Sequence, residues 1–211
     1  MAIEQVRDFH IPFGHPVADS PQLVDSPLFE LRRRLIIEEL KETIRDYHKG
    51  DMVKMVDGFA DLLVVINGAI LVFGGLKGVQ ELYEYDYSYF GDYYENDISS
   101  TPVMPELEDF VRFSHFMFKE MGEVSMAFSS QNVYRVLSGL IKMRNLVLDM
   151  FEVYDIPLEA IENAVHNANM SKLGEDGKPI YREDGKILKG PNFRPPEEDI
   201  ERILKEHGAQ L

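Results

Sequence analysis

A single glycine at position 50 separates two long segments whose apolar residues recur at the spacing of a helix face. The first segment runs over residues 28–49, with Ser26 expected to cap it and Pro27 at its first position. Asp51 follows the glycine and is expected to cap the second segment, which extends to about residue 73. So short a link joins antiparallel neighbours, and the sequence therefore predicts a helical hairpin.

The rest of the chain also favours helices. Apolar periodicity and helix-breaking residues predict them over residues 2–10, 106–128, 132–154, 157–170 and 197–207. Turn signals at Asp176-Gly177 and Asp184-Gly185 predict a short β-ribbon around residues 180–188. We expect an all-α fold, an antiparallel helical bundle, with this ribbon near its carboxyl end.

The 211 residues are enough for one domain, which we expect to span the whole chain. We divide it into residues 1–78, a hairpin with the acidic cluster described below; 79–104, a Tyr-rich acidic linker; 105–172, a second hairpin and the last core helix; and 173–211, a basic, Gly-rich tail and terminal helix. The Tyr-rich segment holds six of the ten tyrosines, so a docking surface for a protein remains the alternative to a linker.

The composition excludes several functions. A formal net charge of −15 opposes binding to a nucleic acid polymer, which depends on basic residues. The longest apolar run, residues 62–73, is too short to span a bilayer and contains Asn67, so no membrane association is expected. There are no cysteines and no pattern typical of a secretory signal, and we expect a cytoplasmic protein. An acidic protein can still bind a nucleotide if a divalent cation lies between them.

The first hairpin concentrates carboxylates at matching heights. Counted from Gly50, Glu39 and Glu42 lie eleven and eight residues before the turn, and Asp57 and Asp61 lie seven and eleven residues after it. Such a cluster repels itself unless a cation neutralises it, and oxygen ligands suit Mg²⁺ or Mn²⁺. The alternative is a solvated helix face paired with nearby arginines, but the two aspartates in an apolar stretch favour the metal site.

The same residues carry a family resemblance. The run Glu38-Glu39-x-x-Glu42, followed by Asp61 on the next helix, resembles the MazG-like and phosphoribosyl-ATP-pyrophosphohydrolase-like group of all-α nucleotide pyrophosphohydrolases. The family pattern has a further glutamate where this chain has Gly58. One branch of the family carries an aspartate four residues before the last one instead, as Asp57 is here, so the number of metal ions stays open.

The tail extends the resemblance. Residues 165–173 read VHNANMSKL and are followed by Gly-Lys-rich segments at 177–181 and 185–191, as that branch commonly shows. The resemblance covers about residues 1–75 and 155–205. It implies Mg²⁺-dependent hydrolysis of a (deoxy)nucleoside triphosphate to the monophosphate and pyrophosphate, in a homodimer or higher homo-oligomer. A phosphoribosyl-ATP pyrophosphohydrolase and a non-catalytic acidic helical adaptor are the alternatives.

The resemblance and the charge pattern together assign roles to the residues. The expected metal ligands are Glu39, Glu42, Asp57 and Asp61, and Glu38 is the candidate for positioning or deprotonating the attacking water. Triphosphate oxygens need positive donors, for which the candidates are Asn169, Lys172, Lys178 and Lys189. The tail must then fold back over the first hairpin or reach the hairpin of a partner subunit.

The second hairpin aligns with the first at an offset of 81 residues. Glu39 and Glu42 then correspond to Glu120 and Glu123, whereas Asp61 corresponds to Lys142. Any two amphipathic hairpins can be aligned in this manner, and identities are few. If the repeat is real, the second hairpin is a degenerate copy that has lost its carboxylate site.

Overall fold

The computed structural model describes residues 3–75, 100–174, 176–180 and 188–211. Its helices are α1 (Ile3–His10), α2 (Ser26–His48), α3 (Met52–Val72), α5 (Leu107–Ser129), α6 (Val133–Val153), α7 (Leu158–Met170) and α8 (Glu197–Glu206). The prediction of an all-α fold is confirmed. The described residues contain no strand, only an isolated antiparallel bridge between Leu173 and Pro179. Most of the predicted ribbon, and residues 79–99 of the Tyr-rich segment, lie outside the described residues.

The first hairpin forms as the sequence predicts, with one correction at its start. Asp25, not Ser26, caps α2: its backbone is extended, and its side chain accepts a hydrogen bond from the backbone N–H of Leu28 at 2.9 Å. Ser26 is already helical, and Pro27 follows it. At the other end Gly50 adopts a φ of +68°, which suits a glycine, and Asp51 caps α3 as predicted.

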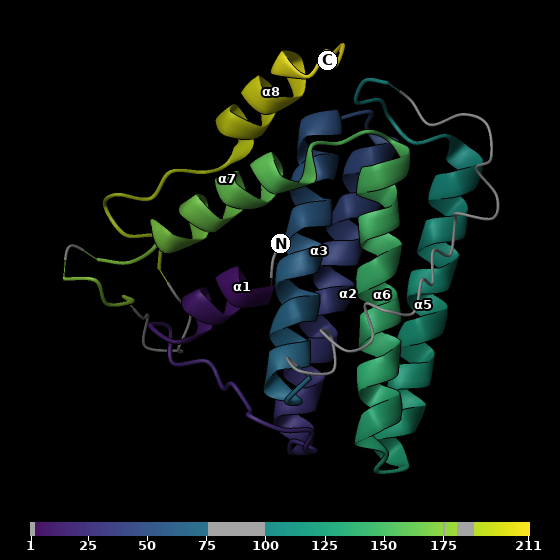
Figure 1. Ribbon diagram of the computed structural model, residues 1–211, viewed down its shortest axis with the longest axis vertical. Helices are drawn as coiled ribbons and strands as arrows, with labels where there is room; N and C mark the ends of the chain where they lie inside the picture. The colour runs from purple at the N-terminus through teal and green to yellow at the C-terminus, as the bar shows by residue number, and fades with distance from the viewer. Residues whose placement is uncertain (1–2, 76–99, 175, 181–187) are drawn as a thin grey trace.

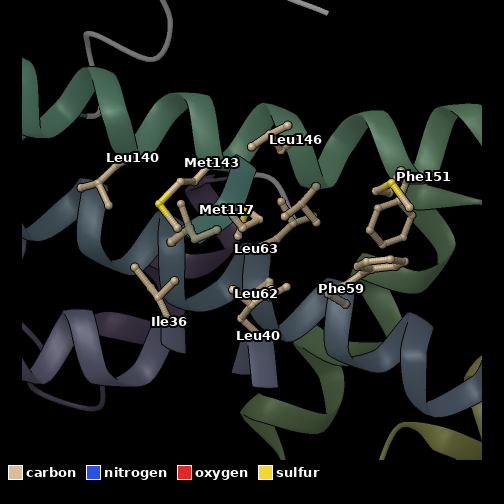
Figure 2. Close-up of a cluster of buried hydrophobic side chains, with 14 of the residues drawn as sticks. Ile36, Leu40, Phe59, Leu62, Leu63, Met117, Leu140, Met143, Leu146 and Phe151 are labelled. Atoms are coloured by element: carbon tan, nitrogen blue, oxygen red, sulfur yellow. The ribbon is translucent and has the colours of Figure 1, made fainter. Parts of the chain in front are cut away.

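Helix α3 is the centre of the molecule. The long helices α2, α3, α5 and α6 lie side by side, with the pair α5–α6 packed along the pair α2–α3 (Figure 1). Apolar side chains of α3 such as Phe59, Leu62 and Leu63 meet Leu146 and Phe151 of α6 in a buried cluster (Figure 2). By length and composition α3 could cross a membrane, but 72% of its apolar window is buried inside this fold, as in the core helix of a globular protein.

The remaining helices cover another side of α3. Helices α1 and α7 pack against it and against each other, and α8 packs against both α3 and α7 (Figure 1). The tail therefore folds back over the first hairpin within the same chain, which is one of the two arrangements that the sequence left open. This arrangement brings residues from the two ends of the chain to one face of α3.

Candidate active site

The site begins where α2 and α3 approach each other most closely. Gly58 of α3 is buried against Thr43 of α2, and a Cβ placed on Gly58 would lie 2.5 Å from the Thr43 hydroxyl oxygen. There is no room for a larger residue unless the helices move apart. The contact therefore gives a physical reason for glycine at position 58, where the family pattern has glutamate. Asp57 precedes this glycine in α3.

Three carboxyl groups of this hairpin have strongly raised pKa values. Burial, and then the charge of Asp61, raises the pKa of Glu39 to about 8. Burial and the charges of Asp61, Glu197 and Glu39 raise the pKa of Asp57 to about 8. Burial raises that of Asp61 to about 6, against the opposing effect of Lys172. The two helices thus hold a set of carboxylates that repel one another, as the sequence predicts.

A pocket of about 170 Å³ opens beside two of these carboxylates. Its walls come from α3, α7, the segment between α7 and α8, and the start of α8: Asp57, Asp61, Val165, Ala168, Asn169, Lys172, Lys189, Phe193, Pro195, Pro196 and Glu197. The Lys172 ammonium donates a hydrogen bond to the Asn169 side-chain oxygen at 2.6 Å. The Lys189 ammonium lies 4.4 Å from the centre of the Phe193 ring. Acidic and basic groups far apart in the sequence therefore share one pocket.

Glu197 is a site residue that the sequence analysis did not select. It begins α8 directly after Pro195-Pro196, lines the pocket, and its charge raises the pKa of both Asp57 and Asp61. Its Oε2 atom is enclosed and has no hydrogen-bond partner, as is also true of the Oδ1 atom of Asp57. Nothing in the spacing of Glu197 indicated this, because only the packing of α8 on α3 brings it to the hairpin.

Four of the predicted site residues do not line the pocket: Glu38, Glu39, Glu42 and Lys178. The Glu42 side chain is 60% exposed and 3.8 Å from Arg45. The Glu38 side chain is 56% exposed, 3.7 Å from Arg34, and lines a separate surface cavity of about 470 Å³. Lys178 is exposed, and its backbone N–H is bonded to Asp176. Within the described parts of the chain, no three Asp, Glu or His side chains already form a group that could hold a metal ion.

The second hairpin repeats the geometry of the first with different chemistry. A Cβ on Gly139 would lie 2.5 Å from the Val124 side chain, and these residues lie 81 positions after Gly58 and Thr43. Glu120, the counterpart of Glu39, is buried, and the Lys142 ammonium lies 3.8 Å from its carboxylate. Lys142 stands at the position of Asp61. Matching contacts at one offset support the repeat. In the second hairpin the ammonium of the half-exposed Lys142 lies where the first hairpin has a carboxylate.

The comparisons with known proteins concern the sequence of the first hairpin above all. A family model described as phosphoribosyl-ATP pyrophosphohydrolase matches residues 6–77, the segment that includes α2 and α3. An uncharacterised protein of Acanthamoeba polyphaga mimivirus is 24% identical over 183 residues, which cover 81% of this chain and 70% of that protein. No solved structure matches. Residues 6–77 of this chain are thus similar to the phosphoribosyl-ATP pyrophosphohydrolase family, in the MazG-like all-α nucleotide pyrophosphohydrolase group.

Proposed function

We propose that this protein is a Mg²⁺-dependent enzyme that hydrolyses a nucleoside triphosphate to the monophosphate and pyrophosphate. One observation carries the proposal: Asp57 and Asp61 of α3 share a pocket with Lys172. Burial and repulsion between carboxylates raise the pKa of Asp57, and the charges of Asp61 and Lys172 also act on the half-buried Glu39 of α2. Carboxylates in such a cluster are stabilised by a cation, and the lysines suit a phosphate. The family match supports the same reaction class.

The residues fit a hard divalent cation. Asp57 and Glu197 each have an enclosed carboxylate oxygen without a hydrogen-bond partner, and such oxygens are typical Mg²⁺ ligands. Glu39, Asp57, Asp61 and Glu197 would hold the ion together with Glu42, whose exposed side chain is free to turn inwards from Arg45. A bound Mg²⁺ polarises phosphoryl oxygens and neutralises the charge that develops on them.

The other residues of the pocket act on the substrate. Lys172 and Lys189 bind phosphate oxygens that the metal leaves free, and Asn169 holds the Lys172 ammonium in place. Water attacks the α-phosphorus, so that a new P–O bond forms while the bond to the bridging oxygen breaks and pyrophosphate leaves. The water's proton passes to a carboxylate base. Glu38 remains the prediction for this role, although its side chain must first turn away from Arg34.

A substrate panel tests the reaction. We expect Mg²⁺-dependent release of pyrophosphate from one or more of the common ribo- and deoxyribonucleoside triphosphates. Glu39→Gln should abolish this turnover, whereas the matched control Glu30→Gln should not, because Glu30 is exposed and paired with Arg33. Orthophosphate as the primary product, or near-normal turnover in Glu39→Gln, would contradict the proposal.

A second candidate substrate is phosphoribosyl-ATP, because the matching family model bears that description. The same panel decides between the two when phosphoribosyl-ATP is included. A non-catalytic adaptor is distinguished by thermal stability instead: an enzyme should melt at a higher temperature with Mg²⁺ and a nucleotide, because both bind only its folded state. An adaptor that binds neither should show no such shift.

A further inference from the structure

A second cluster on the first hairpin takes no part in the proposed reaction. Arg32 of α2 is only 6% exposed, and its Nε atom is enclosed without a hydrogen-bond partner. Across the described ranges, no side chain forms an ion pair with this guanidinium or accepts a hydrogen bond from it. Burial lowers its pKa only to about 10, so it stays charged at neutral pH. A buried charged donor without an acceptor is costly and indicates a missing partner.

The groups around Arg32 are neutral and aromatic. His10 is 2% exposed, its Nδ1 lies 3.3 Å from the Pro16 carbonyl oxygen, and burial and the Arg32 charge lower its pKa to about 3. The His15 ring lies 5.0 Å from the His10 ring and 5.9 Å from the Phe9 ring. These rings supply stacking surfaces beside the Arg32 guanidinium.

Arg32 lies in register with the carboxylate site. Arg32 and Glu39 are seven residues apart on α2, as are Gly68 and Asp61 on α3, so each pair shares one helix face. A Cβ on Gly68 would lie 2.8 Å from the His10 Nε2 atom and 3.3 Å from an Arg32 nitrogen, so both side chains lie against the α3 backbone. Two helical turns, about 10 Å, therefore separate the Arg32 cluster from the carboxylates.

This spacing fits the two ends of a nucleotide. Lys172 and Lys189 already supply positive charge for phosphate beside Asp61. The cluster at the far end combines a guanidinium with aromatic rings, which suits a nucleobase better than a phosphate because a base offers both a π face and carbonyl acceptors. Arginine has donors only, so it favours a base that presents an oxygen over one that presents an amino group at the same position.

We propose that Arg32 recognises a carbonyl oxygen of the substrate's base, with the rings of Phe9, His10 and His15 around that base. The inference rests on the proposed function, since it takes the substrate to be a nucleotide whose phosphates bind at the carboxylates. Because Arg32 and His10 are buried in this structure, a base must displace neighbouring groups to reach them. The chemical class is a keto base, such as hypoxanthine, guanine or uracil.

Binding of nucleoside monophosphates in the presence of Mg²⁺ tests the inference without turnover, because a monophosphate lacks the bond that the proposed reaction breaks. Inosine monophosphate carries a keto oxygen where adenosine monophosphate carries an amino group. Uridine and cytidine monophosphate differ in the same way. By titration calorimetry we expect the wild type to bind the keto member of at least one pair roughly tenfold more tightly. In Arg32→Gln the ratio of the keto to the amino affinity should fall to about twofold or less. The control Arg33→Gln changes an arginine that is paired with Glu30, and it should keep the wild-type ratio.

Each other outcome has a defined meaning. Equal affinity for keto and amino bases in the wild type, or an unchanged ratio in folded Arg32→Gln protein, would show that Arg32 is structural. If Arg32→Gln weakens binding of inorganic pyrophosphate as strongly as that of inosine monophosphate, the guanidinium contacts phosphate and the inference is wrong. If Arg32→Gln does not fold, Arg32→Lys takes its place in the test. Lysine keeps the positive charge but lacks the paired N–H donors of arginine, so the ratio of keto to amino affinity should fall severalfold. If the protein prefers keto bases but hydrolyses no triphosphate, the proposed function is overturned and the inference about Arg32 is not.

Discussion

Replacing Asp61 by Asn should stabilise the metal-free protein at alkaline pH. The Asp61 charge is the largest charged contribution to the raised pKa of both Glu39 and Asp57. If the Asp61 charge raises each of these two pKa values by about 1, its removal stabilises the fold by roughly 2–3 kcal/mol, because a pKa change of 1 corresponds to about 1.4 kcal/mol. Loss of the favourable interaction with Lys172 offsets part of this gain. We expect a net gain of about 1–2 kcal/mol.

The pH dependence gives the sharper test. A carboxyl group whose pKa is higher in the folded state than in the unfolded state binds its proton more tightly when folded, so the wild type should lose stability as pH rises from about 5 to 8. The advantage of Asp61→Asn should shrink as pH falls through about 8, where Glu39 and Asp57 take up protons, and vanish below about 6, where Asp61 is protonated as well.

Thermal melts in EDTA across this pH range measure both effects. A net gain of 1–2 kcal/mol corresponds to a rise of roughly 2–8 °C in Tm for a chain of this size. Glu30→Gln, an exposed acid on α2, is the control and should leave the melting profile unchanged. If Asp61→Asn melts no higher than the wild type at pH 8 and keeps its pH slope, the carboxylates do not repel one another and the reasoning for a metal site fails.

Three further changes test the site. Gly58→Ala should destabilise the protein by about 1–3 kcal/mol in urea unfolding, because its Cβ would meet Thr43; an unchanged midpoint would mean that the helices separate freely. Lys172→Ala should raise KM and lower kcat for a triphosphate in steady-state kinetics, since a charged contact to phosphate is lost; unaltered kinetics would remove Lys172 from the substrate site. Glu197→Gln should weaken Mg²⁺ binding in calorimetry, as one enclosed carboxylate is lost, and an unchanged affinity would show that Glu197 is not a ligand.

Much of the fold follows from local sequence patterns. Apolar periodicity and Gly50 predict the α2–α3 hairpin because helix formation and its termination depend on residues a few positions apart. The matching heights of Glu39 and Asp61 follow from the same pattern, since the rise per residue is fixed in a helix. The cap of α2 was assigned one residue late, as helix ends depend on local backbone geometry that composition does not specify.

The long-range arrangement depends on tertiary packing. Position in the sequence does not reveal that α7 and α8 fold back onto α3 in the same chain, which is what brings Lys172 and Glu197 to the carboxylates. Nor does it show that Gly58 is a point of helix contact or that Arg32 is buried without an acceptor. The sequence determined which residues share a helix face, because that periodicity is local. Only the packed structure decided which faces meet, because burial and charge compensation depend on distant segments lying close together.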